Sequence, residues 1–108
     1  MKAIERLLWW LFAGSAGGPS RARIVHALND RPYNANQLAE RLGMDYKTVR
    51  HHLGLLEKNG LITSMGGRYG KMYSLSTLLE ENYEFFNRIW ARIGKNGINE
   101  EADRKVRT

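Results

Sequence analysis

Residues 34–61 read NANQLAERLGMDYKTVRHHLGLLEKNGL, and this stretch decides the fold. The spacing of its apolar residues predicts a short helix over about 36–42 and a longer one over about 45–58. Gly43 follows the first helix at a position that favours a left-handed backbone, which glycine adopts without steric cost. Asp45 is a residue type that caps the start of a helix. The stretch therefore predicts two helices joined by a tight turn.

The second predicted helix has two chemically different faces. Val49, Leu53 and Leu56 recur at positions i, i+4 and i+7 and would form a buried stripe. The other face carries side chains that can contact phosphates and base edges, namely Tyr46, Lys47, Thr48, Arg50 and His51. The pair of helices predicts a helix-turn-helix whose second helix, the recognition helix, lies in the major groove of DNA.

The hydrophobic period changes after the second helix. Residues 61–65 and 71–75 look like strands, and the segment GGRYG between them, residues 66–70, is a glycine-rich turn, so a β-hairpin is expected. A helix-turn-helix followed by such a hairpin is a winged helix. We expect the wing to lie along the DNA backbone or in the minor groove, because a narrow minor groove attracts arginine. The expected contact residues of the wing are Arg68, Tyr69 and Lys71.

Residues 20–75 resemble the winged-helix transcriptional regulators of the ArsR-like group. The resemblance is carried by LAERLGMDYKTVRHHLGLLEKNGLI and by the glycine-tipped hairpin after it. It implies a homodimeric regulator that binds double-stranded DNA, and the basic recognition helix looks closer to archaeal proteins of this type. Thiolate sensors of that group carry a cysteine pair in the helix before the recognition helix. This chain has no cysteine, so the resemblance does not extend to their metal-sensing function.

Composition and charge agree with one small DNA-binding domain. The 108 residues can form one hydrophobic core of modest size. Nearly all of the net charge of +6 lies in residues 20–75, which hold nine Lys or Arg and four Asp or Glu, whereas residues 76–108 hold six of each kind. Such clustering is typical of a surface that binds phosphates. The absence of cysteine excludes disulfides and is compatible with the cytoplasm, where we expect the protein to reside.

The N-terminal segment 2–13 is predicted to form a short apolar helix. Its uninterrupted apolar run, residues 7–13, is too short to cross a bilayer, and Glu5 lies in the part that is basic in a secretory signal. We expect this helix to pack against the core or against a second subunit; a cleaved signal and contact with a membrane surface are the alternatives. Its expected interface residues are Leu7, Leu8, Trp9, Leu11 and Phe12.

The C-terminal part predicts a second dimerisation helix over 77–93, because its wide apolar stripe exceeds what one small domain needs to cover. Its expected interface residues are Tyr83, Phe86, Trp90 and Ile93. A two-fold dimer would place two recognition helices about 34 Å apart, one turn of DNA. The alternative is that this helix only closes the core of the monomer.

The predicted fold class is mainly α with a small β-hairpin, a winged helix-turn-helix with helices at both termini that form a dimer interface. The chain is expected to comprise an N-terminal helix with linker, a DNA-binding domain, a dimerisation helix and a disordered tail: 1–19, 20–75, 76–93 and 94–108. Within this scheme residues 14–19 are a flexible link, and Ser20 caps a helix over 21–29.

Catalysis and cofactor binding are not expected from the sequence. Adjacent residues on a helix point about 100° apart, so His51 and His52 make a poor metal site, and His26 lies on another predicted helix. The GGRYG segment lies between strands rather than before a helix, which argues against a nucleotide-binding loop. The sequence therefore favours a DNA-binding regulator with no metal, cofactor or small-molecule substrate. A winged-helix module that binds only proteins is the alternative.

Overall fold

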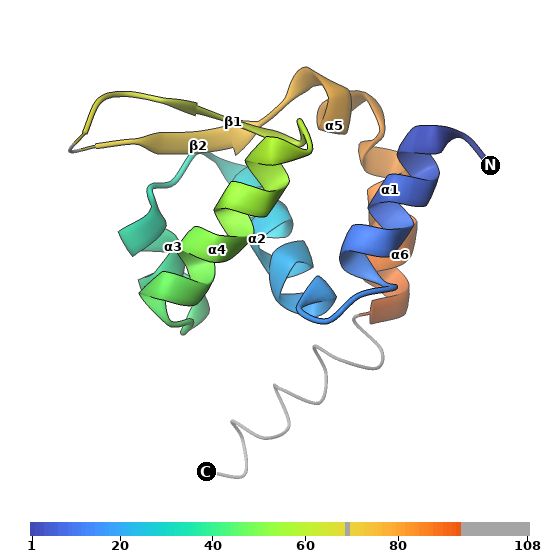
Figure 1. The fold of residues 1–108 in the computed structure, drawn as a ribbon, viewed down its shortest axis with the longest axis horizontal. Helices are drawn as coiled ribbons and strands as arrows, with labels where there is room; N and C mark the ends of the chain where they lie inside the picture. Colours follow the sequence, from blue (N-terminus) through green and yellow to red (C-terminus); the bar gives the residue numbers. More distant parts are fainter. Residues whose placement is uncertain (69, 94–108) are drawn as a thin grey trace, which may run out of the picture. The chain divides into compact units, whose positions relative to one another are not determined.

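The structure is a computed structural model that describes residues 1–68 and 70–93. It is mainly helical with one antiparallel pair of strands (Figure 1), which confirms the predicted winged helix-turn-helix class. The elements in chain order are α1 (Ala3–Phe12), α2 (Gly18–Asp30), α3 (Ala35–Leu42), α4 (Tyr46–Lys58), β1 (Ile62–Met65), β2 (Met72–Leu75), α5 (Thr77–Glu81) and α6 (Tyr83–Ile93). Tyr69 and the tail 94–108, expected to be disordered, lie outside the described residues.

The chain divides into two compact units. One unit is Arg23–Glu81 and contains α3, α4, the two strands and α5. The other combines Met1–Ala22 with the segment that begins at Asn82, and so contains α1 and α6. Within the described part of the chain, no helix is long and apolar enough to span a membrane.

Local capping sets the helix-turn-helix in the unit Arg23–Glu81. The side-chain oxygen of Asn34 accepts the backbone N–H of Gln37 at 2.7 Å, and the Gln37 side chain accepts the backbone N–H of Asn34 at 2.8 Å, so α3 begins with a reciprocal cap. Gly43 ends α3 with a left-handed φ of 64°. The Asp45 carboxylate then accepts the backbone N–H of Thr48 at 3.2 Å and starts α4. The predicted turn chemistry is confirmed at Gly43 and Asp45.

The core of this unit lies behind α4. Val49, Leu53 and Leu56 are fully buried, as the i, i+4, i+7 spacing predicts. The Arg23 guanidinium donates to the carbonyl of Leu42 at 2.8 Å and so ties the end of α3 to α2. Buried residues of α2, α3 and the strands complete the core, among them Ile24, Val25, Leu28, Leu38, Leu61, Ile62 and Tyr73.

The two strands form the wing, here defined as residues 62–75. They pair antiparallel, with Ile62 opposite Leu75 and Met65 opposite Met72. The wing is also bonded to the segment before α3, because the Tyr73 N–H donates to the Tyr33 carbonyl at 2.9 Å and the Tyr33 N–H to the Tyr73 carbonyl at 3.3 Å. This bridge fixes one edge of the wing next to the start of α3. It was not predicted from the sequence.

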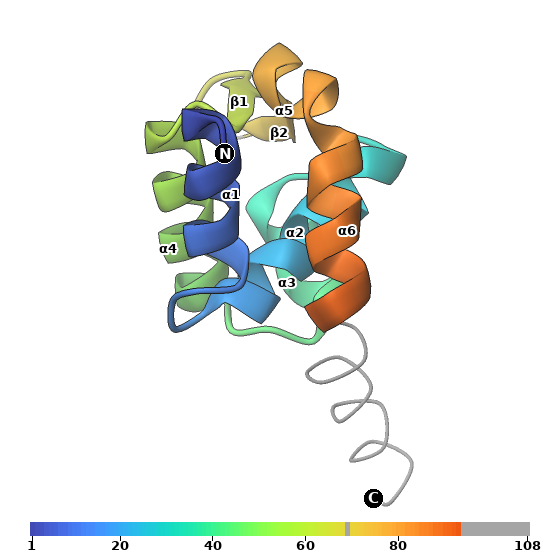
Figure 2. The same ribbon diagram turned by 90° about the vertical axis from the view of Figure 1, so that its right-hand side faces the viewer.

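The unit that combines Met1–Ala22 with the segment from Asn82 is here called the terminal unit. It is built on α1 and α6, which lie side by side (Figures 1 and 2). The rings of Phe12 and Phe86 meet edge to face with centroids 5.0 Å apart. Arg21 is only 3% exposed, and its guanidinium donates to the Leu11 carbonyl at 3.0 Å and to the Ser15 hydroxyl at 2.6 Å. A buried arginine thus holds the connection between α1 and α2.

The expected link 14–19 extends two residues too far, and the expected Ser20 cap is wrong. Helix α2 begins at Gly18, and Ser20 lies within its first turn. A Cβ at Gly18 would lie 2.5 Å from the carbonyl oxygen of Phe12, so only glycine permits this close approach of the two backbones.

The expected single helix over 77–93 is also wrong, because it is interrupted at Asn82. The backbone N–H groups of Phe85 and Phe86 donate to the Asn82 carbonyl, so α6 begins anew there. The hydroxyl of Ser76 accepts the N–H of Leu79 at 3.2 Å, which caps the separate α5.

Five of the nine residues expected at a dimer interface are buried within the chain itself. They are Leu8, Leu11, Phe12, Phe86 and Ile93. A side chain enclosed by its own chain cannot offer its surface to a partner, so these five are corrected to core residues. Trp9 and Trp10 remain exposed, at 39% and 53%, and the dimer itself stays a prediction.

The Tyr83 hydroxyl yields a stability prediction. It is buried and, among the described residues, has no hydrogen-bond partner, and burial raises the pKa of Tyr83 to about 12. Because an unsatisfied buried hydroxyl is unfavourable, Tyr83→Phe should raise the free energy of unfolding by about 1 kcal/mol in urea titrations at pH 7.

The same substitution should change the alkaline stability. Above pH 10 the unfolded phenol ionises while the folded one stays neutral up to about pH 12, so this group lowers stability as the pH rises between these values. Tyr83→Phe should lack that loss. Destabilisation of the variant at pH 7 would mean that the hydroxyl is hydrogen-bonded in solution.

A pair of adjacent glycines tests the turn of the wing. Gly66 has a φ of 108°, and a Cβ there would lie 2.7 Å from the Gly70 carbonyl oxygen, whereas a Cβ on Gly67 meets nothing within 4 Å. Gly66→Ala should destabilise the β1–β2 pairing by about 1–3 kcal/mol, measured by hydrogen exchange of the strand amides. Gly67→Ala is the matched control and should leave the exchange unchanged; equal effects of the two substitutions would contradict the geometry.

Candidate nucleic-acid interface

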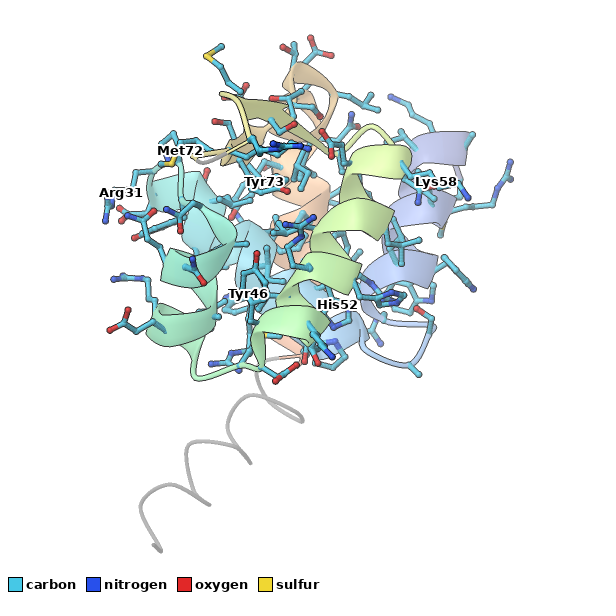
Figure 3. All side chains as sticks on the ribbon, turned by 60° about the vertical axis from the view of Figure 1, so that its left-hand side comes forward. Arg31, Tyr46, His52, Lys58, Met72 and Tyr73 are labelled. Atoms are coloured by element: carbon cyan, nitrogen blue, oxygen red, sulfur yellow. The ribbon has the colours of Figure 1, made fainter. Side chains whose placement is uncertain are left out.

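The exposed face of α4 carries the residues that the sequence assigned to DNA. These are Tyr46, Lys47, Thr48, Arg50 and His51, and each is exposed. His52 lies on the same helix but is buried. Figure 3 shows Tyr46 and Lys58 at opposite ends of α4. Helix α4 therefore packs against the core with one face and exposes the other face to solvent.

Tyr46 and Arg50 form a pair on this face, one helical turn apart. An Nη of Arg50 donates to the Tyr46 hydroxyl at 3.2 Å, and the guanidinium carbon lies 6.0 Å from the ring centroid. The hydrogen bond to Tyr46 is the main cause that raises the pKa of Arg50 above its ordinary value. The arginine is thus held in one orientation and remains cationic at any physiological pH.

Between α4, the start of α3 and the wing lies a hollow of about 320 Å³. Three of its lining residues are cationic, and none of the described residues that line it is acidic. The lining consists of Asn34, Ala35, Asn36, Tyr46, Arg50, Arg68, Gly70, Lys71 and Tyr73. The hollow therefore concentrates positive charge and hydrogen-bond donors from three separate segments of one compact unit.

The structure brings together four of the eight predicted contact residues. Tyr46, Arg50, Arg68 and Lys71 line the hollow. The other described residues, Lys47, Thr48 and His51, are exposed on α4 but do not line it, and Tyr69 lies outside the described residues.

Asn34, Asn36 and Tyr73 also line this site but were not predicted from the sequence. A local signal for Asn34 existed, since an Asn followed three residues later by Gln is a helix-start pattern. Its proximity to the wing depends on the bridge between Tyr33 and Tyr73, which no local pattern reports.

Two further cations near the site were also missed. The guanidinium carbons of Arg31 and Arg41 lie 4.4 Å and 5.5 Å from the ring centroid of Tyr33, within the range of cation–π attraction. Both arginines are exposed. They add positive charge around Tyr33, whose backbone is bonded to Tyr73 of the hollow.

Chemically, this surface can bind anions. Guanidinium and ammonium groups, carboxamides and hydroxyls are the groups that contact phosphate oxygens in protein–DNA complexes. In the described ranges, no three His, Cys, Asp or Glu side chains gather closely enough to hold a metal ion.

Comparisons with known proteins agree with this geometry. Residues 18–64 match the family described as bacterial regulatory protein, arsR family. No curated protein sequence matches the chain.

Solved structures of low sequence identity share the fold over most of the chain. Diamide-treated YodB from B. subtilis is 20% identical with a TM-score of 0.65, and the alignment covers 89% of this chain and 95% of that one. The transcriptional repressor BigR from Xylella fastidiosa is 17% identical with a TM-score of 0.61, with coverages of 89% and 85%. The transcriptional regulator HlyU from Vibrio vulnificus is 16% identical with a TM-score of 0.59, with coverages of 87% and 90%.

Helix α3, the turn at Gly43, helix α4 and most of β1 all fall inside the matched residues. The paired strands beyond them complete the wing. The chain is therefore a winged helix-turn-helix protein whose residues 18–64 match the family described as bacterial regulatory protein, arsR family.

Proposed function

We propose that this protein is a transcriptional regulator that binds a specific sequence of double-stranded DNA. Helix α4 lies in the major groove, and the wing lies along the backbone or in the minor groove. The observation that carries the proposal is the exposed face of α4, whose cations continue across the hollow to Arg68 and Lys71 of the wing. The family match over residues 18–64 supports the same assignment.

The contacts divide by chemistry. Lys47, Arg50 and Arg68 hold phosphates or enter the minor groove, because their charges attract any DNA regardless of sequence. Base edges are contacted by the exposed polar side chains of α4, which are Tyr46, Thr48 and His51.

Gly54 supports a close approach of DNA to α4. It is exposed, it follows Arg50 by four residues and Lys47 by seven, and a Cβ there would meet nothing within 4 Å. Residues at these spacings share one helix face. The missing side chain therefore leaves room for a duplex on the same face as the cations.

We also propose that the protein acts in the cytoplasm as a homodimer. Trp9 and Trp10 on α1 are exposed, and large aromatic side chains are enriched at protein interfaces. A second copy of α1 is the partner of this surface, since two-fold dimers place two recognition helices on two half-sites.

The DNA-binding role predicts a specific loss when Arg50 is removed. Arg50→Ala should weaken binding to a selected duplex about tenfold and reduce the slope of log K against log salt by about one unit, because one phosphate contact is lost. The measurement is a fluorescence-anisotropy titration at several salt concentrations. Lys58→Ala removes the same charge at the other end of α4 and is the matched control.

A wild-type protein that binds no duplex even at low salt would overturn the proposal and favour a module that binds proteins. Equal losses for Arg50→Ala and Lys58→Ala would show that only net charge matters and would remove the assignment of α4 to the groove.

The dimer has its own test in sedimentation velocity at micromolar concentration. Trp10→Glu should convert the dimer to a monomer, because a charge would replace an apolar contact at the interface. Met65→Glu changes another exposed apolar residue, 81% exposed on β1, and should leave the dimer intact. A wild-type protein that sediments as a monomer would contradict the proposed dimer.

A further inference from the structure

The hollow between α3, α4 and the wing is more than a stretch of basic surface. Arg50 comes from α4, whereas Arg68 and Lys71 come from the wing, and all three line a space of about 320 Å³. Like charges gathered in one place repel one another, and none of the described lining residues is an Asp or Glu that would neutralise them. An anion in the hollow would relieve this repulsion.

The uncharged groups around the hollow also suit an anion. Ala35 and Asn36 are the first two residues of α3, where backbone N–H groups have no acceptor within the helix and the helix dipole is positive. The side-chain oxygen of Asn34 already accepts the N–H of Gln37, so its remaining hydrogen-bonding group is the donor NH₂.

The side chain of Arg50 is oriented by a hydrogen bond even without a ligand. Its bond to Tyr46 uses one N–H of the guanidinium and leaves the rest of the planar donor set for another acceptor. Lys71 is likewise positioned, with its Nζ 5.9 Å from the ring centroid of Tyr73. Groups held in place in this way lose less conformational entropy when they bind.

We infer that the hollow is a discrete binding site for one phosphate group, held by Arg50, Arg68 and Lys71 with the amides at the start of α3. A tetrahedral phosphate anion matches the cations and donors that line the hollow, and the volume lies at the small end of ligand pockets. The phosphate can belong to the DNA backbone or to a small free anion such as pyrophosphate. In the second case the anion competes with DNA for Arg50 and Arg68, a consequence that rests on the proposed function.

The first arm of the test uses the full chain without DNA. Pyrophosphate is titrated into the protein by calorimetry at constant ionic strength, with sodium chloride as the balancing salt. The double variant Arg68→Ala, Lys71→Ala removes two cations of the hollow, and Lys58→Ala, Arg88→Ala removes one lysine and one arginine that are exposed and do not line it. The hollow variant should lose at least tenfold in affinity, while the matched variant binds like wild type.

The second arm uses DNA with one uncharged methylphosphonate linkage in each half-site, the two at symmetry-related positions and moved together along the duplex one position at a time. At the position whose phosphate occupies the hollow, Arg68→Ala should cause no further loss of affinity, whereas at all other positions it should weaken binding as it does with unmodified DNA. A single such position identifies the DNA backbone as the source of the phosphate, and binding in the first arm identifies a free anion.

Equal weakening of pyrophosphate binding by the two double variants, together with no special methylphosphonate position, would overturn the inference. Asn36→Asp places a carboxylate in the hollow without removing a cation, and it should abolish binding in whichever arm is positive. Circular dichroism confirms that each variant is folded.

The two proposals can fail separately. A protein that binds duplex DNA but is negative in both arms retains its proposed function and loses this site. A protein that binds pyrophosphate through Arg68 and Lys71 but binds no DNA retains this site and loses the proposed function.

Discussion

The site depends on one small constraint, the pair of backbone hydrogen bonds between Tyr33 and Tyr73. An isolated two-stranded ribbon is marginally stable in water, so the wing needs support from the rest of its unit. The bridge supplies it by joining β2 to the residue that precedes the cap of α3. Without this support, mutual repulsion would favour separation of the cations of the wing from Arg50, because none of the described lining residues is acidic.

Much of the helix-turn-helix could be predicted from the sequence because its determinants are local. The left-handed turn at Gly43, the cap at Asp45 and the buried stripe of α4 involve residues within about two helical turns of one another. The exposed face of α4 follows from the same periodicity, since residues that alternate with a buried stripe must face away from it. These features needed no knowledge of distant contacts.

The remaining features depend on residues far apart in the chain. The hollow exists because the bridge between Tyr33 and Tyr73 brings Asn36 near the wing, and the core of the terminal unit exists because Phe12 meets Phe86. Apolar periodicity identifies a face that will be covered but does not say what covers it. For this reason it predicted for a dimer interface five residues that the chain buries within itself.

The two faces of helix α4 have separate roles, because the buried face stabilises the fold and the exposed face is available for binding. Val49, Leu53 and Leu56 supply buried apolar area on one face, and nothing in their packing requires the cations on the other. Arg50 contributes to the exposed face mainly by its orientation, since its hydrogen bond joins it to Tyr46 rather than to the core. A helix arranged in this way can change its exposed residues with small effects on folding, because surface substitutions away from buried contacts usually alter stability by about 0.5 kcal/mol or less. The exposed face is therefore free to vary without loss of the fold, while the buried face keeps the helix in place.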